Sequence, residues 1–464
     1  MDLRGQKIVV VGLGRSGMAA AKLAVSQGAE VLISEKRSLE AIDGKDKTFV
    51  EDLGVFLEAG GHRPETFAWA DLIVVSPGVP RQGKAFETAY RKGIPIIGEL
   101  ELAASFLRSP VVAITGTNGK TTVTALVADM LRFSGKRVFV GGNFGIPLSE
   151  YVSGSQLADL VVLEISSFQL ETIRDFRPHI GVLLNITPDH LERYRSFEEY
   201  ARVKFRLFEN QRPDDVAIIN GRDPETLRYL PELKARVFIY GPKGQVAYLR
   251  EPLAILRLSE TEERYDLSLF RLLGRHNREN FLAAALAARL AGASPEAVAQ
   301  AAKEFVGYPH RLEFITQVGG VYFVNDSKAT NVDATAKALE GLEGPIVLIA
   351  GGRDKGGSYL PLADLIRHKV KALILMGESR EKMAQELGMI TETYQVESLE
   401  EAVEVAMSLA HPGDTVLLSP ACASFDQFAS YKERGRAFRS LVLELAPQII
   451  APRGALETSE VIYH

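Results

Sequence analysis

The chain has 464 residues, more than one hydrophobic core usually holds, so we expect about three domains. Hydrophobic residues make up 46% of the chain and charged residues 24%, as in soluble globular proteins, and a net charge of −5 gives no basic field that would favour nucleic acid as a partner. The single cysteine, Cys422, excludes a disulfide within the chain and a cysteine-rich metal site.

The N-terminus runs directly into a strand-and-turn pattern rather than a signal peptide. No apolar run approaches the roughly 20 residues that span a bilayer. The simplest expectation is a cytoplasmic protein, monomeric and without a membrane partner.

Short apolar, β-branched runs alternate with helical stretches, which predicts an α/β fold with parallel sheets covered by helices. A first series of expected strands, with a helix from about Ser16, covers 7–14, 31–35, 71–79 and 93–99. A second series begins at Val111 and covers 111–114, 137–143, 159–167, 179–187 and 214–220. A third covers 321–327, 345–352, 372–377 and 414–420. We therefore expect three domains, at 1–98, 99–307 and 308–464.

The end of the second series has a different character. Its short runs are expected to form antiparallel strands at 235–241, 246–250, 253–258 and 265–270. Helices at 277–292 and 294–305 close this middle domain, and a long helix from Asp426 closes the third.

The strongest motif is a glycine-rich loop between the strand at 111–114 and a helix, formed by Gly116, Thr117, Asn118, Gly119, Lys120, Thr121 and Thr122. Small residues let backbone N–H groups wrap a phosphate, and the helix N-terminus adds partial positive charge. Lys120 can reach the terminal phosphates of a nucleotide, and Thr121 can bind the accompanying Mg²⁺. The general pattern would place its first glycine at Ile114, so this is a shortened variant. The alternative is an ordinary glycine-rich turn.

Glu164 ends the expected strand at 159–164 and is followed by two serines. Carboxylate and hydroxyl oxygens are ligands that Mg²⁺ prefers. A solvated glutamate at a strand end is commonplace, but after a phosphate loop, a helix and a strand it is a candidate metal ligand.

A second glycine turn lies at the N-terminus, where Gly12, Gly14 and Gly17 have dinucleotide-binding spacing and Glu35 ends the next strand. Alone this turn would suggest NAD. Its physical content is a tight turn and a helix N-terminus that can hold any nucleotide diphosphate, including that of a UDP-sugar. Because hydride transfer has no use for ATP, the second phosphate loop argues against a dehydrogenase.

Seven segments in order resemble the Mur ligases of peptidoglycan synthesis: TGTNGKTT, EISSFQL, NITPDHL, GRHNREN, YPHRLE, NDSKATN and LSPACASFDQF. NDSKATN is similar to the D-glutamate-adding branch rather than to the branches adding L-alanine, a diamino acid or a dipeptide. Folylpolyglutamate synthetase has a similar ATP core, but its chain begins with the ATP domain. The resemblance implies Rossmann-like first and third domains around a P-loop ATPase-like domain that carries a small antiparallel sheet.

The resemblance also implies roles at the ATP site. Lys120 would neutralise the transferred phosphate, and Thr121 and Glu164 would bind one Mg²⁺. His190 would bind a second Mg²⁺ near the acceptor carboxylate, although a lone histidine is more often on the surface. Lys204 matches a carbamylated lysine of the family, and an anionic carbamate can bind a metal that an ammonium would repel. The alternative is that Lys204 is an ordinary solvated cation on an amphipathic helix.

Further nucleotide contacts are implied on both sides of the 307/308 boundary. Asn277 and Asn280 lie three residues apart, hence on one helix face, and would lie near adenine; helix capping is the alternative for Asn277. Arg311 resembles a residue that reaches the ATP phosphates when domains close. Asp326 matches a carboxylate that contacts the nucleotide, through ribose.

A D-glutamate pocket needs cations and hydrogen-bond donors, because the ligand carries two carboxylates. The resemblance assigns this pocket to Lys328, Thr330, Lys355, Ser424, Phe425 and Tyr431. Arg353 is an alternative to Lys355, since the alignment there is ambiguous by one residue, and core packing is the alternative for both aromatic residues. Cys422 has no base partner and is expected to be structural.

The resemblance assigns the UDP-sugar to residues at the carboxyl ends of expected parallel strands, the usual binding edge. These residues are Arg15, Ser16, Glu35, Arg37, Gly78 and Asn143.

The expected function is an ATP-dependent amide ligase that activates a carboxylate as an acyl phosphate. The implied substrates are ATP, UDP-N-acetylmuramoyl-L-alanine and D-glutamate, with two Mg²⁺ ions as cofactors. A nucleotide-dependent switch or ATPase is one alternative, and a non-catalytic UDP-sugar-binding protein is another.

Overall fold

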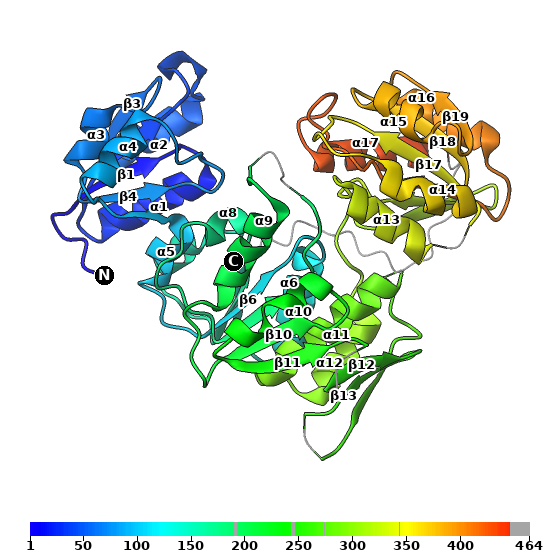
Figure 1. The fold of residues 1–464 in the computed structure, drawn as a ribbon, viewed down its shortest axis with the longest axis horizontal. Coiled ribbons are helices and arrows are strands. Elements are labelled where there is room, and N and C mark those ends of the chain that lie inside the picture. The colour runs from blue at the N-terminus through cyan, green and yellow to red at the C-terminus, as the bar shows by residue number, and fades with distance from the viewer. Residues whose placement is uncertain (190–192, 243–245, 259, 273, 343, 446–464) are drawn as a thin grey trace. The chain divides into compact units, whose positions relative to one another are not determined.

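The computed structural model describes residues 1–189, 193–242, 246–258, 260–272, 274–342 and 344–445. The chain divides into two compact units, unit 1 (1–271 with 277–305) and unit 2 (272–276 with 306–464). Figure 1 shows strands and helices mixed throughout both units, which confirms the predicted α/β class. Among the described helices, none combines the length and the apolar character needed to cross a membrane.

The first sheet of unit 1 has five parallel strands in the order β3-β2-β1-β4-β5. Its strands are β1 (Lys7–Val11), β2 (Glu30–Glu35), β3 (Phe56–Ala59), β4 (Leu72–Val75) and β5 (Ile96–Gly98). Its helices are α1 (Arg15–Ser26), η1 (Leu39–Ala41), α2 (Gly44–Leu53), α3 (Pro64–Trp69), α4 (Lys84–Arg91) and α5 (Glu99–Ala104).

Strand β1 is apolar along almost its whole length because both of its faces are buried. Ile8 and Val10 belong to one hydrophobic core, and Val9 and Val11 belong to another. Alternate side chains of a strand point to opposite faces, so both faces of this sheet are covered. The chain runs outward from β1 through β2 to β3 and then crosses over β1 to β4 and β5, so the strand order reverses between β1 and β4, the position at which sheets of this kind usually bind ligands.

The second sheet of unit 1 has nine strands in the order β14-β13-β12-β11-β10-β9-β6-β8-β7. They are β6 (Val111–Thr115), β7 (Val138–Gly142), β8 (Leu160–Glu164), β9 (Ile180–Leu183), β10 (Val216–Asn220), β11 (Arg236–Tyr240), β12 (Ala247–Arg250), β13 (Leu253–Leu256) and β14 (Glu263–Asp266). The helices are α6 (Lys120–Phe133), α7 (Leu148–Val152), α8 (Ser167–Leu170), α9 (Phe197–Phe205), η2 (Arg206–Phe208), α10 (Pro224–Arg228), η3 (Leu230–Glu232), α11 (Arg275–Leu290) and α12 (Pro295–Glu304).

One expectation about this sheet is wrong. Strand β11 pairs in parallel with β10, because the connection between them contains α10 and η3 and returns the chain to the starting edge. Antiparallel pairing begins only at β12, which is joined to β13 by a tight hairpin. These last strands extend the main sheet.

Unit 2 contains a six-stranded sheet in the order β15-β16-β20-β17-β18-β19, antiparallel only between β15 and β16. Its strands are β15 (Glu313–Val318), β16 (Val321–Asn325), β17 (Ile346–Gly351), β18 (Val370–Met376), β19 (Glu392–Gln395) and β20 (Thr415–Leu418). Its helices are α13 (Val332–Gly341), η4 (Leu360–Leu362), α14 (Ala363–Lys369), α15 (Arg380–Leu387), α16 (Leu399–Leu409) and α17 (Tyr431–Leu445).

The last helix begins five residues later than the expected start at Asp426. Ser430 caps it, because its Oγ accepts the N–H of Glu433 at 3.2 Å. Asp426 instead accepts the N–H of Glu378 at 3.0 Å and so belongs to the loop between β20 and α17.

Candidate active site

The glycine-rich loop joins β6 to α6, as the sequence predicts. Gly116 and Gly119 have φ values of 151° and 87°, in the region that favours glycine. A Cβ atom on Gly119 would lie 2.5 Å from Oδ1 of Asn280. Since Gly119 is also the N-cap of α6, no side chain of the cap residue covers the first turn of the helix. The loop thus offers small residues and a helix N-terminus to an anion.

The segment after β9 holds this loop in place through hydrogen bonds. The carbonyl of Asn185 accepts the N–H of Thr117 at 2.9 Å. Its side-chain amide accepts the N–H of Asn118 at 2.8 Å and donates to the carbonyl of Asn118 at 3.0 Å. Thr117 also donates from Oγ1 to the carbonyl of Thr187 at 3.1 Å. Asn185 is a site residue that the sequence predictions did not include, although it lies in the segment NITPDHL; the structure brings it to the loop because β9 lies directly beside β6.

Two lysines converge on one carbonyl of the loop. Lys120 Nζ donates to the carbonyl oxygens of Gly116 at 2.9 Å and Thr117 at 2.8 Å, and Lys204 Nζ donates to that of Gly116 at 2.9 Å. Lys204 extends from α9, is only 2% exposed, and lies 4.6 Å from the ring centre of Tyr200. Burial and then the charge of Lys120 lower the pKa of Lys204 well below its usual value, although Asp189 opposes this. Compared with an exposed lysine, this shift favours the neutral amine, which is the form that can react with CO₂.

The first turn of α6 also carries an oxygen-rich pair. Thr121 Oγ1 donates to Glu164 Oε2 at 2.5 Å, and both side chains are buried. Asn143, assigned to the UDP-sugar by resemblance, donates from Nδ2 to Glu164 Oε1 at 2.8 Å. The carboxylate is therefore held from both sides. His190 lies outside the described residues.

Helix α11 brings its two asparagines to the same region. Asn280 donates to Oδ1 of Asn277 at 3.2 Å, which confirms that they share a helix face, and Asn280 borders Gly119 of the phosphate loop.

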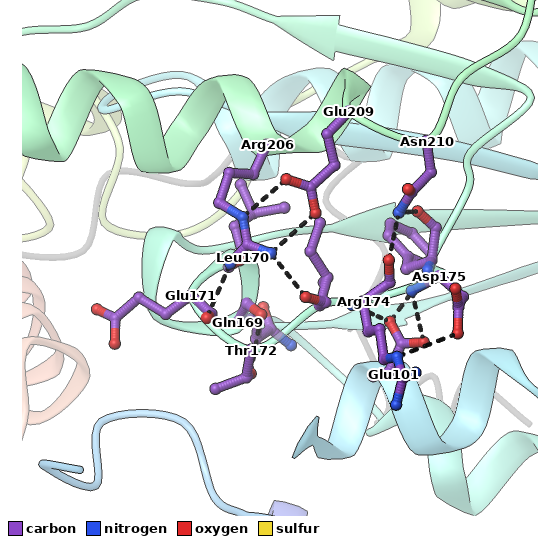
Figure 2. Close-up of polar contacts among 12 residues, drawn as sticks. Glu101, Gln169, Leu170, Glu171, Thr172, Arg174, Asp175, Arg206, Glu209 and Asn210 are labelled. Carbon is purple, nitrogen blue, oxygen red and sulfur yellow. Dashed lines mark hydrogen bonds and ion pairs between the residues drawn. The ribbon is translucent and has the colours of Figure 1, made fainter. Parts of the chain in front are cut away.

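Three polar side chains fix the stretch 170–176, which is the last residue of α8 and the loop after it (Figure 2). Arg206 donates to three backbone carbonyls at 170, 171 and 173, with distances from 2.7 to 2.8 Å. Glu101 accepts the three N–H groups at 174–176, at 2.8 to 3.0 Å, and Asn210 donates to two carbonyls of the same stretch. Because Arg206 follows Lys204 by two residues, this network also ties the end of α9 to the loop. A charged residue on a helix is normally expected to be solvated, so no sequence pattern indicates this network.

Glu171 projects from this loop and forms a buried ionic centre, its side chain being 9% exposed. It pairs with Arg193 at 2.7 Å and with Arg81 at 3.7 Å, and it accepts the hydroxyl of Tyr194 at 2.9 Å. Arg193 in turn donates to the carbonyl of Gly78 at 3.0 Å. The loop after β4, which contains a residue assigned to the UDP-sugar, is thereby bound to the loop after α8.

The N-terminal glycine turn is held by Glu35. Its carboxylate accepts the N–H of Leu13 at 2.7 Å and the N–H of Arg37 at 2.9 Å. Burial raises the pKa of Glu35, but these N–H groups and the Arg37 guanidinium outweigh it, so the pKa is lowered. Gly17 packs so closely that a Cβ atom there would lie 1.9 Å from the carbonyl oxygen of Gly12. The predicted ligand-binding carboxylate therefore also shapes the turn itself.

Arg15 and Ser16 begin α1, next to this turn. Arg15 is mostly exposed and lies 3.9 Å from Glu150. The N-cap residue of α1 is Gly14, which carries no side chain. As at α6, no side chain of the cap residue therefore covers the backbone N–H groups of the first turn.

The D-glutamate candidates of unit 2 follow β16, β17 and β20, three neighbouring strands. Lys328 Nζ lies 4.0 Å from the ring centre of Tyr431, a cation–π contact. Thr330 donates its N–H to the carbonyl of Lys328 at 2.8 Å. Ser424 is buried, whereas Phe425 is 62% exposed and so is not part of the core.

The loop after β17 is connected to the loop after β20. Arg353 donates its N–H to the carbonyl of Ala423 at 2.9 Å, while its side chain pairs with Glu378 at 3.3 Å. Lys355, by contrast, has an exposed side chain. Burial raises the pKa of the Cys422 thiol, which fits a structural role for this residue.

Asp326 is buried. Its carboxylate accepts the Ser419 hydroxyl at 2.9 Å and the N–H of Leu312 at 3.2 Å. Burial raises its pKa to about 7, despite the opposing effect of these hydrogen bonds and of Arg311. Arg311 lies between His310 and Leu312, which have positive φ values of 69° and 44°. Asp326 therefore fastens the strained segment that carries Arg311.

Three family models match the chain in sequence. They are described as the Mur ligase MurD-like N-terminal domain at residues 6–98, the Mur ligase middle domain at 114–288, and the Mur ligase glutamate ligase domain at 310–422. Together they cover most of the chain.

Curated relatives match over nearly their whole length. The UDP-N-acetylmuramoylalanine–D-glutamate ligase of Geotalea daltonii is 46% identical over 450 residues, covering 96% of this chain and 99% of that one. The ligase of the same name from Acidobacterium capsulatum is 47% identical over 449 residues, covering 96% and 97%.

Solved structures show the same fold at low sequence identity. A pseudomurein peptide ligase type C from Methanothermus fervidus has a TM-score of 0.62 at 21% identity, covering 95% of this chain and 100% of that one. The MurF ligase of Thermotoga maritima, solved with ADP, has a TM-score of 0.60 at 16% identity, covering 96% and 97%.

Proposed function

The chain belongs to the Mur ligase family, and from this membership we propose that it joins D-glutamate to UDP-N-acetylmuramoyl-L-alanine with ATP as the energy source. The observation that carries the substrate assignment is the similarity, over almost the full length of both chains, to relatives named for this reaction. The described geometry supports the ATP part: a glycine loop, two converging lysines and a buried threonine–glutamate pair lie together.

The proposed reaction has two steps. The free carboxylate of the UDP-linked acceptor attacks the γ-phosphorus of ATP, forming an acyl phosphate and releasing ADP. The amine of D-glutamate then attacks the acyl carbon, and phosphate leaves with the carboxylate oxygen that it had gained, as the amide forms and the amine loses its proton. The first step brings two anions together, so positive charge at the phosphate loop is required. Lys120 supplies part of that charge.

The Thr121–Glu164 pair fits Mg²⁺, because it combines a hydroxyl and a carboxylate that are buried and already aligned. When bound, Mg²⁺ supplies positive charge at the phosphate oxygens. We assign one ion to this pair and a second to His190 and Lys204.

We further propose that Lys204 acts as a carbamate. Its amine shares the Gly116 carbonyl with the half-buried Lys120, whose positive charge opposes a second positive charge on the buried Lys204. Addition of CO₂ to the neutral amine releases a proton and replaces that repulsion with attraction, while giving the site an anionic ligand for a metal.

We also propose the remaining substrate contacts from the resemblance of their motifs to those of the family. For ATP they are the glycine loop, Asn277, Asn280, Arg311 and Asp326; for the UDP-sugar, Arg15, Ser16, Glu35, Arg37, Gly78 and Asn143; for D-glutamate, Lys328, Thr330, Lys355, Ser424, Phe425 and Tyr431. We divide the chain into a UDP-sugar domain at 1–98, an ATP domain at 99–307 and an amino-acid domain at 308–464. Family-model matches that end at residue 98 and begin at residue 310 support these boundaries.

In the cell, we place the protein in the cytoplasm as a monomer, without nucleic acid or membrane as a partner. There it would make a precursor of peptidoglycan and so serve cell-wall growth, cell shape and division.

The decisive assay follows phosphate release from MgATP with each substrate omitted in turn. The proposal predicts release only when UDP-N-acetylmuramoyl-L-alanine and D-glutamate are both present, with one amide formed per phosphate. ATP turnover without either substrate would instead identify an ATPase or switch. Binding of the UDP-sugar with no turnover would identify a non-catalytic binding protein. Replacing D-glutamate with L-glutamate tests the stereochemistry.

A further inference from the structure

Arg434 is among the largest fully buried side chains of the protein, with 1% of its surface exposed. It lies one turn into α17, on the face turned towards the sheet of unit 2. Burial lowers its pKa to about 10, so the guanidinium remains charged at neutral pH. Within the part of the chain that the structure describes, no carboxylate forms an ion pair with it. Such an arginine is costly to bury, so its hydrogen bonds require an explanation.

Those hydrogen bonds join two loops that lie far apart in the sequence. Towards the loop after β16, Nε donates to Ser327 Oγ at 3.0 Å and Nη2 donates to the carbonyl of Ser327 at 2.9 Å. Towards the loop after β20, Nη1 donates to the carbonyl of Ala423 at 3.3 Å and Nη2 to that of Cys422 at 3.2 Å. A planar fork with fixed spacing thus lies between the two loops.

Each loop places a D-glutamate candidate directly beside its contact with Arg434. Lys328 follows Ser327, and Ser424 follows Ala423. The Ser327 hydroxyl also donates to the carbonyl of Tyr431 at 2.9 Å, and the ring of Tyr431 lies against Lys328. The first two turns of α17 therefore fasten the Lys328 side of the pocket.

The loop after β17 is included in the same arrangement. A Cβ atom on Gly352 would lie 2.3 Å from the carbonyl oxygen of Ala423 and 3.1 Å from Nη1 of Arg434. Arg353 meets the same carbonyl through its N–H. The guanidinium therefore lies where the loops after β16, β17 and β20 meet.

We propose that Arg434 is a positioning residue for D-glutamate, which sets the distance between the loop of Lys328 and the loop of Ser424 so that together they fit a five-carbon dicarboxylate. This inference rests on the proposed function, because it takes D-glutamate as the ligand of these loops. Arg434 itself does not contact the substrate. Its rigid fork fixes the spacing of the pocket, and its charge adds to the positive potential there.

The test replaces Arg434 with lysine, which keeps the charge and removes the planar fork. Arg439→Lys is the matched control, since Arg439 lies on the same helix and forms an exposed ion pair with Glu313. Steady-state kinetics give KM for each substrate, D-glutamate is compared with the shorter D-aspartate, and thermal unfolding is recorded in parallel. Because small misplacements of binding groups have large kinetic effects, we expect KM for D-glutamate to rise by at least about tenfold in R434K.

In the same variant, KM for ATP and for the UDP-linked acceptor should stay within twofold of the parent, and the preference for D-glutamate over D-aspartate should fall. R439K should leave all of these values unchanged. A fall in unfolding temperature with KM for D-glutamate and the preference unchanged would mean that Arg434 is only structural, and would overturn the proposal.

Ser327→Ala provides a second variant that leaves the arginine in place and removes one acceptor. It should raise KM for D-glutamate by about threefold or more, also without affecting the other substrates, and an unchanged KM would count against the proposal even if R434K does not fold. Absence of D-glutamate-dependent phosphate release in the parent protein would show instead that the proposed function has failed, and the inference with it.

Discussion

Replacing Asp326 with asparagine should make the protein more stable relative to the parent as the pH rises. Asparagine has nearly the same shape and can accept the N–H of Leu312 with its oxygen and donate to the Ser419 hydroxyl with its nitrogen. The substitution therefore removes a titrating group and keeps the hydrogen bond from Leu312, while the bond with Ser419 reverses its direction and the Ser419 hydroxyl can donate to Thr335 Oγ1 instead.

The sign follows from the raised pKa. Burial moves the pKa of Asp326 from 3.8 to about 7, so the unfolded chain releases this proton at a lower pH than the folded protein does. Below the lower value both states are protonated and the group has no effect. Between the two values the folded state binds more protons, so stability falls as pH rises, and above the higher value the loss is constant.

The size of the effect follows from the same two values. A gap of about three pKa units corresponds to a ceiling of about 4 kcal/mol. About two of these units fall between pH 5 and pH 8.5, or about 3 kcal/mol, which corresponds to roughly 5–10 °C in a domain of this size.

The assay is scanning calorimetry of the full chain, with D326N and the parent compared at pH 5 and pH 8.5. Asp364→Asn, at an exposed position of unit 2, serves as the control and should show no such change with pH. A difference between D326N and the parent that is the same at both pH values would show that Asp326 titrates as an ordinary carboxyl, and would refute the reasoning.

Three further predictions concern the sites in unit 1. Lys204→Ala should lower activity by about a hundredfold, with partial recovery in acetate or another short carboxylic acid, and full activity without rescue would remove the proposed carbamate. Gly119→Ala should raise KM for ATP by roughly tenfold, because the backbone is left-handed there and Asn280 obstructs the new methyl group, while binding of the UDP-linked acceptor measured by calorimetry should not change. Gly17→Ala should lower the stability of unit 1 by about 2 kcal/mol or more and weaken acceptor binding, since the methyl group collides with the carbonyl of Gly12; normal acceptor affinity would contradict this.

Sequence reasoning found the phosphate loop because its chemistry is local. The strand, the glycines, Lys120 and the following helix are contiguous, and each is recognisable by residue type. The approach of Lys204 to the carbonyl of Gly116 spans 88 residues, and no periodicity reports it. Only the resemblance directed attention to that lysine.

The roles of the buried carboxylates are harder to predict from the sequence. Glu35 and Asp326 were assigned to ligands, whereas in the structure their oxygens are also engaged with backbone N–H groups and, for Asp326, a hydroxyl. A strand-end carboxylate looks the same in sequence whether it faces a ligand or supports a turn, because the difference depends on non-local packing.

The direction of β11 shows a similar limit. A short apolar run is compatible with either pairing, and the choice depends on the connection before it. Here that connection contains helical turns and produces a parallel strand. Arg434 was missed for the opposite reason, since a charged residue on a helix is normally exposed.

The account as a whole depends on a phosphate group becoming attached to an oxygen of the acceptor. Labelling both oxygens of the free carboxylate of UDP-N-acetylmuramoyl-L-alanine with oxygen-18, and analysing the products by mass spectrometry, tests this directly. The account predicts one labelled oxygen in each inorganic phosphate and one in each amide. Amide formation that leaves the phosphate unlabelled would contradict it.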